Sequence, residues 1–198
     1  MSRSARWIRL DPAAMRSFML TCRGFSQAQT EGDAPICLWG RALQSVRLDD
    51  GLWAELGDLI FVLIVPRRFA PRPSRWLAWG LTPLLTALRN RGEHAYMDGG
   101  DIVMHGNRIA GGGAKEIAGS VVVFGTFPAD PPFEPPQSGE RGRLLEFDPW
   151  LDALNREGRA RQMLGAFRHA VETQHGWQFD TDWPNGNERL AIAGQFAS

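Results

Sequence analysis

The residues best suited to chemistry gather in one segment, which combines a carboxylate, two cations and three consecutive glycines. Asp101 opens it, Arg108 follows a Gly106-Asn107 turn, and Lys115 follows Gly111, Gly112 and Gly113. A guanidinium or an ammonium binds carbonyl and phosphate oxygens, and glycine lets the backbone approach a ligand closely. Lys115 is the only lysine beside 21 arginines, so a mechanism that needs a lysine has one candidate.

Each of these residues also has a purely structural interpretation. Asp101 can be a turn residue that begins a strand, Arg108 a surface arginine of a hairpin, and Lys115 an exposed loop lysine. The three glycines can form a flexible turn or a bulge. The residue types alone leave both interpretations open.

The elements that must position this segment follow from hydrophobic spacing and turn signals. We expect helices over 11–28, 75–89 and 159–175, with Pro83 kinking or splitting the second helix. We expect strands over 36–39, 59–65, 120–127 and 144–147, and a hairpin whose strands are 101–105 and 108–110. We expect an irregular conformation over 40–58. In the tail, residues 177–198, we expect a turn at 184–186 and a last short helix.

Composition narrows the function classes. The 198 residues include 43% hydrophobic and 22% charged residues, as expected for one globular domain. A net charge of zero argues against a nucleic-acid binder. The longest apolar run, Leu59 to Val65, is far shorter than the roughly 20 residues that span a bilayer. No apolar core follows Arg9, so we expect no secretory signal, no membrane association and a cytoplasmic protein.

Cysteines and histidines do not suggest a metal site. Cys22 and Cys37 match no metal-binding spacing, and the four histidines are scattered along the chain. We therefore expect two core thiols in a reducing compartment and no metal.

The order of motifs resembles that of the biotin/lipoate protein ligases and octanoyltransferases. In the hairpin, the matching residues are Asp101, Gly106, Ile109, Ala110 and Gly111. The segments 32–39, 57–66 and 121–126 are similar to family strands before and after the hairpin, so the resemblance covers about residues 8–175. It implies an α+β fold, with a mixed, largely antiparallel sheet flanked by helices, as a single domain over 1–198.

The resemblance also implies an activity. Such enzymes activate an acid such as lipoate or octanoate and pass the acyl group to a lysine of a carrier domain. We therefore expect an acyltransferase or ligase whose partner is a lipoyl-type carrier protein. Arg108 stands at the family's lysine position, and Gly100 stands where the family has asparagine before Asp101. Arg108, Lys115 and Asp101 are the implied catalytic residues, and Gly111, Gly112 and Gly113 are implied in substrate binding.

The family's glycine-rich loop has a poor counterpart here. Arg47 matches the family arginine and Gly51 is the one glycine, so both are implied in substrate binding. Leu48 and Asp49 replace residues that adopt positive φ, and Asp49 and Asp50 would repel a phosphate. ATP use is therefore doubtful; a lipoyl or octanoyl group is the implied ligand, and no cofactor is certain.

An alternative function follows from the same departures. A ligase-like module without catalysis would bind a carrier domain or a partner protein, and a partner chain could complete its site. A nucleophilic-cysteine mechanism is unsupported, because no cysteine follows Cys37.

Overall fold

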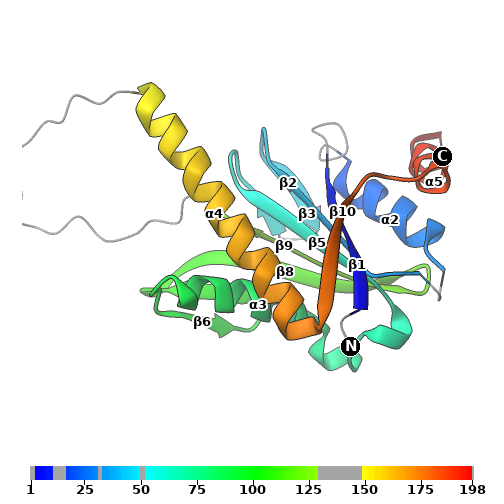
Figure 1. The fold of residues 1–198 in the computed structure, drawn as a ribbon, viewed down its shortest axis with the longest axis horizontal. Coiled ribbons are helices and arrows are strands. Elements are labelled where there is room, and N and C mark those ends of the chain that lie inside the picture. Colours follow the sequence, from blue (N-terminus) through cyan, green and yellow to red (C-terminus); the bar gives the residue numbers. More distant parts are fainter. Residues whose placement is uncertain (1–2, 11–16, 31–32, 50–51, 129–148, 198) are drawn as a thin grey trace, which may run out of the picture.

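A computed structural model of the chain describes residues 3–10, 17–30, 33–49, 52–128 and 149–197. The main sheet has the strand order β10-β1-β2-β5-β9-β8-β7-β6, with helices on both of its faces (Figure 1). Its first pairs, β10 with β1 and β1 with β2, are parallel, and the remaining neighbours are antiparallel. The predicted α+β class, with a mixed and largely antiparallel sheet, is confirmed.

The strands of the main sheet are β1 (Arg3–Arg9), β2 (Ile36–Arg41), β5 (Leu59–Pro66), β6 (Ala95–Asp98), β7 (Asp101–Met104), β8 (Asn107–Ile117), β9 (Ser120–Phe127) and β10 (Trp177–Asp182). A separate hairpin consists of β3 (Val46–Asp49) and β4 (Leu52–Ala54). The helices are α2 (Phe18–Ala28), α3 (Trp76–Asn90), α4 (Pro149–His175) and α5 (Gly186–Ala197), with 3-10 turns η1 (Arg67–Phe69) and η2 (Pro73–Arg75).

The central strand β5 is buried along its whole length because both faces of the sheet are covered. Phe61, Leu63 and Val65 face α3 and α4, whereas Ile60 and Val62 face α2 and the β3–β4 hairpin. The rings of Phe61 and of Phe167 on α4 lie 4.6 Å apart between centroids. Two apolar cores, one on each face, therefore hold the sheet.

Several sequence-based predictions are confirmed. Strands occupy 36–41, 59–66 and 120–127, a hairpin pairs 101–104 with β8, and the helix predicted at 159–175 begins earlier, at Pro149. The helix predicted at 11–28 appears as α2 from Phe18, and residues 11–16 and the strand predicted at 144–147 lie outside the described residues. Pro83 does not split α3, because buried leucines on both sides of the proline pack the helix onto the sheet.

The prediction of an irregular stretch over 40–58 is wrong. Val46 and Leu48 on β3, and Leu52 and Ala54 on β4, are buried in alternation with exposed Arg47 and Trp53. This two-residue period flanks an Asp50-Gly51 dipeptide, which is a hairpin signal in the sequence.

The prediction of a flexible turn or bulge at the three glycines is also wrong. They lie inside β8, where Gly111, Gly112 and Gly113 pair with Thr126, Gly125 and Phe124 of β9. A Cβ atom on Gly113 would lie 2.6 Å from the Phe124 ring, so the glycines make room for packing. The register of this hairpin shifts before the glycines instead: Ile102 and Val103 of β7 pair with Ala110 and Arg108, so the extra residue is Ile109 of β8.

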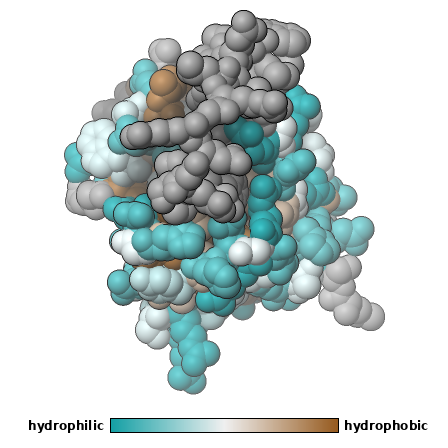
Figure 2. Space-filling view, turned by 90° about the vertical axis from the view of Figure 1, so that its left-hand side faces the viewer, coloured by the Kyte–Doolittle hydropathy of each residue, from teal (hydrophilic) through white to brown (hydrophobic). Residues whose placement is uncertain are grey.

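Surface character agrees with a chain that buries its apolar residues. Figure 2 shows mostly hydrophilic side chains over the coloured part of that face, with hydrophobic ones gathered near its upper left. Among the helices of the described residues, none is both long and apolar enough to cross a membrane.

Candidate functional site

A cavity of about 250 Å³ lies at the end of the sheet where β5 begins and β9 ends. Its walls are Trp53 of β4, Glu55 and Asp58 of the following turn, the start of β8 from Arg108 to Gly111, and Thr126 and Phe127 of β9. The cavity thus joins the β3–β4 hairpin to the hairpin that the sequence singled out. Its volume is near the lower end of the range for small-molecule sites.

Arg108 and Asp101 form an ion pair beside this cavity, with Nε and Oδ1 2.9 Å apart. Gly111 makes the arrangement possible, because a Cβ atom there would lie 2.3 Å from Arg108 Nη2 and 2.9 Å from Asp101 Oδ1. The guanidinium therefore lies directly over the glycine backbone. Since Nε faces Asp101, the Nη groups remain as donors for a ligand oxygen.

Asp58 is a carboxyl of the cavity wall whose pKa is shifted by its surroundings. Burial raises its pKa, and hydrogen bonds to its Oδ2 from the Glu55 backbone N–H (2.9 Å) and the Thr126 hydroxyl (3.2 Å) oppose that shift. A carboxyl with a raised pKa in a cavity can accept and release a proton nearer neutral pH. Asp58 was not among the site residues predicted from the sequence, although an acidic residue after Gly57 at the start of a fully apolar strand was an available signal.

Lys115 lines a different hollow. Its Nζ lies 2.9 Å from Asp49 Oδ1 and 5.5 Å from the Phe124 ring centroid. That hollow, of about 410 Å³, lies between β8 and α2 residues such as Met19 and Arg23. Arg108 and Lys115 stand seven residues apart on one strand, roughly 24 Å in extended chain. The structure therefore does not bring the two cations together.

The remaining predicted site residues are Gly112, Gly113, Arg47 and Gly51. Gly112 and Gly113 are within β8, next to the cavity-lining Gly111, and a Cβ atom on Gly112 would lie 2.7 Å from the Phe124 carbonyl oxygen. Arg47 is exposed on β3 and is not part of the cavity wall. Gly51 lies outside the described residues.

Carboxylates outnumber cations at the cavity. Among the described residues, Glu55 and Asp58 line it and Asp101 borders it, whereas Arg108 is the one cationic side chain in its wall. Such a site attracts an amine cation and disfavours a phosphate. It can also hold a neutral carbonyl oxygen on the guanidinium.

Thiol chemistry finds little support in the described residues. Both cysteines are buried, and burial raises the pKa of the Cys22 thiol to about 12, so its reactive thiolate is scarce. No group of three or more potential metal ligands occurs within the parts of the chain that the structure describes.

Comparison with solved structures identifies the fold. An archaeal bi-partite lipoate protein ligase from Thermoplasma acidophilum matches with a TM-score of 0.69 and 13% identity, over 99% of this chain and 93% of that one. A T. acidophilum protein solved with bound lipoic acid matches with a TM-score of 0.67 and 15% identity, over 100% and 95%. A biotin acetyl coenzyme A carboxylase synthetase from Helicobacter pylori matches with a TM-score of 0.52 and 13% identity, over 87% and 75%.

No protein-family model matches the sequence, and comparison with curated proteins found no match. The structural likeness nevertheless covers 99% and 100% of this chain in the two T. acidophilum structures. This chain therefore has the fold of the lipoate and biotin protein ligases, as the order of its motifs predicts.

Proposed function

We propose that this chain, acting as one ligase-like domain over residues 1–198, transfers a lipoate- or octanoate-type acyl group to a lysine of a lipoyl-type carrier domain. The observation that carries the proposal is the Arg108 guanidinium, which Asp101 and Gly111 hold beside a cavity that also contains Asp58. The similar archaeal ligase is bi-partite, and its structural analysis includes its E2 lipoyl domain. This supports a carrier domain as partner and a second chain that completes the site.

The residues have distinct roles in the proposed transfer. The carrier lysine enters as an ammonium attracted by Glu55 and Asp58, and Asp58 takes one proton from it. The amine attacks the acyl carbonyl carbon while Arg108 donates hydrogen bonds to the carbonyl oxygen. The amide C–N bond forms, the bond to the leaving group breaks, and a second amine proton goes to the leaving group. When the donor is a thioester, the leaving group therefore departs as a thiol.

Intact-mass spectrometry of an apo lipoyl domain tests the proposal. One reaction contains octanoyl-carrier protein and another contains lipoate with ATP, each with a working control ligase in parallel. We expect an octanoyl mass gain in the first. A gain only with lipoate and ATP would show ligation instead of transfer.

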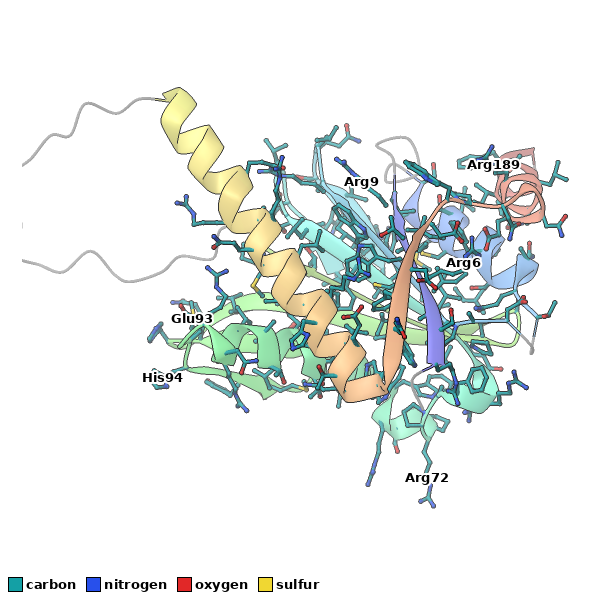
Figure 3. The ribbon with its side chains drawn as sticks, viewed as in Figure 1. Arg6, Arg9, Arg72, Glu93, His94 and Arg189 are labelled. Atoms are coloured by element: carbon teal, nitrogen blue, oxygen red, sulfur yellow. The ribbon has the colours of Figure 1, made fainter. Side chains whose placement is uncertain are left out.

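Variants separate the two candidate cations. Arg108→Ala should abolish the mass gain, and Arg72→Ala, an exposed arginine that points away from the body of the protein (Figure 3), is the matched control. Lys115→Ala tests the other predicted catalytic cation, whose ammonium already pairs with Asp49. Full activity in the double variant Arg108→Ala/Lys115→Ala would refute both assignments.

A second candidate function is a non-catalytic module that binds a carrier domain or partner protein. The observation that favours it is the β3–β4 hairpin, which puts buried Val46, Leu48 and Leu52 where the resemblance in motif order implies the family's glycine-rich loop. This candidate predicts a stable complex with the lipoyl domain, measured by calorimetry, and no mass gain in either reaction.

A further inference from the structure

Arginines gather at the end of the sheet opposite the candidate cavity, where β5 ends. Arg67 and Arg68 lie in η1, and Arg72 and Arg75 stand at the two ends of η2. Arg3 begins β1, and this end of β1 lies beside the two turns at the lower end of the molecule (Figure 1). All five residues are exposed. We call these five arginines the arginine patch.

Aromatic rings hold three of the guanidinium groups in place. The Cζ atoms of Arg3 and Arg68 lie 3.9 and 4.2 Å from the centroid of one ring, that of Phe69. The Cζ atom of Arg67 lies 5.1 Å from the centroid of the Trp76 ring. A guanidinium that covers a ring keeps the N–H donors at its edge free for an anion. The patch is therefore partly ordered before any partner binds.

No carboxylate forms an ion pair with the patch among the described residues. The sequence has no acidic residue between Asp58 and Glu93. The N-terminus of α3 would be stabilised by acidic side chains, yet its N-cap residue is Arg75 and its first turn has no acidic residue. Five like charges at one end of the molecule also repel one another. The patch costs stability, which indicates a role in binding.

The shape of the patch suits a macromolecule. The two turns project from the lower end of the molecule, and Arg72 points away from its body (Figure 1, Figure 3). A projecting surface cannot enclose a small anion as a pocket does. It can instead contact the surface of a larger partner, and arginine is enriched in such interfaces.

The surroundings of the patch favour an acidic protein over nucleic acid or a membrane. The chain has no net charge, and exposed Asp33, before β2, and exposed Glu116, in β8, stand at the same end of the sheet. A long polyanion would extend beyond the patch and meet these carboxylates, whereas a compact acidic segment would not. The exposed large hydrophobic side chains of the described residues all lie outside the two turns, so the patch offers no anchor for a bilayer.

We propose that the arginine patch binds an acidic segment of a partner protein other than the carrier domain. Its guanidinium groups donate paired hydrogen bonds to the carboxylates of that segment. Asp58 and Arg67 stand nine residues apart on either side of β5, roughly 30 Å in extended chain. A partner on the patch therefore leaves the candidate cavity open, and the proposal holds whether or not the chain is an enzyme.

Fluorescence polarisation of the full chain with a labelled peptide that alternates glutamate and serine tests the patch. A matched peptide has glutamine in place of glutamate. At physiological salt we expect the glutamate peptide to bind at least tenfold more tightly, and its affinity should fall as salt rises. Arg68→Gln/Arg72→Gln/Arg75→Gln, the patch variant, should weaken its binding at least tenfold. This variant keeps Arg67, which covers the ring of Trp76.

The control variant Arg23→Gln/Arg161→Gln/Arg189→Gln changes the net charge equally and removes three exposed arginines of other elements. It should leave the affinity for the glutamate peptide unchanged. Circular dichroism confirms that both variants are folded. Arg72→Glu changes one side chain that points into solvent, so it keeps its fold and should weaken binding at least threefold by itself. The peptide assay needs no acyl transfer, so its result is independent of the proposed function.

Equal affinity for the two peptides would overturn the proposal, as would equal weakening by the patch and control variants or unchanged affinity in Arg72→Glu. Duplex DNA or phosphatidylglycerol vesicles that bind the patch more tightly than the peptide would assign it to nucleic acid or to a membrane instead. Slower acyl transfer in the patch variant than in the control variant would make the carrier domain the partner, which also overturns the proposal.

Discussion

Gly111→Ala is the sharpest test of how the candidate site is built. The new Cβ atom would lie 2.3 Å from Arg108 Nη2 and 2.9 Å from Asp101 Oδ1, so the ion pair must move. Both side chains are about half exposed, at 49% and 41%, and can swing into solvent. The lost pair costs about 0.2–1 kcal/mol, and alanine is about 0.5–1 kcal/mol better than glycine within a strand. The free energy of unfolding should therefore change by less than about 1 kcal/mol.

Activity should respond much more strongly than stability. Displacing a positioning group by about 1 Å can cost on the order of 100-fold in rate, so we expect acyl transfer by Gly111→Ala to fall about that far. The assay follows the mass of the lipoyl domain over time.

The neighbouring Gly112→Ala is the matched contrast. Its Cβ atom would lie 2.7 Å from the Phe124 carbonyl oxygen and 2.9 Å from Leu81 Cδ2. A backbone oxygen cannot swing away, so overpacking should cost about 1–3 kcal/mol in urea unfolding. Equal destabilisation by the two variants, or an unchanged transfer rate in Gly111→Ala, would falsify the role given to Gly111.

Three further predictions concern charge. Arg6→Met leaves the carboxylate of Glu188, which is 3% exposed, without its cationic partner. We expect urea unfolding to show a decrease of about 3 kcal/mol in the free energy of unfolding, partly restored by the second substitution Glu188→Leu. No restoration in the double variant would contradict the pairing. Burial lowers the pKa of His175 from 6.5 to about 4, where its ring stacks 4.1 Å from that of Trp79. The unfolded chain takes up the proton at higher pH than the folded chain. As pH falls from about 6.5 to 4, the free energy of unfolding should therefore decrease by up to about 3 kcal/mol more than that of His175→Phe. Parallel curves of unfolding free energy against pH for the two proteins would refute this. Asp58→Asn should slow acyl transfer about 100-fold or more. Its stability at neutral pH should be equal to or higher than that of the wild type, because burial disfavours the ionised carboxylate. Lower stability would mean that the fold needs the charge.

The fold was predictable where the pattern is local. Leu59 to Val65 is uniformly apolar and contains four β-branched residues, and it forms the doubly buried strand β5. The strand β1 was not predictable in this way, because Arg6 stands among its apolar residues. The carboxylates that bind Arg6, those of Asp182 and Glu188, are 176 and 182 residues away in sequence. Only the folded chain therefore shows why an arginine is tolerated there.

The site was predictable in part for the same reason. Asp101 and Arg108 flank one turn, and local spacing was sufficient to associate them. Asp58 comes from another strand, and only the sheet order, with β5 beside β9 and β9 beside β8, brings it to the same cavity. The interpretation of the glycines failed because they allow close approach and not backbone freedom: Gly111 makes room for Arg108 and Asp101, and Gly112 and Gly113 make room for Phe124. Sequence alone does not distinguish the two uses.

The charges at the cavity favour one kind of acyl donor. Asp101 pairs with Arg108, and Glu55 and Asp58 line the same cavity. Two like charges about 5 Å apart repel by roughly 1–3 kcal/mol at effective dielectric constants of 80 to 20. An acyl-adenylate brings a phosphate anion into this field, whereas a thioester donor is neutral. The incoming lysine, as a cation, is attracted by the same carboxylates. Lys115 offers no relief to a phosphate here, since it pairs with Asp49 beside a different hollow. If the chain acts as proposed, these electrostatics favour transfer from an already activated acyl group over ATP-dependent ligation.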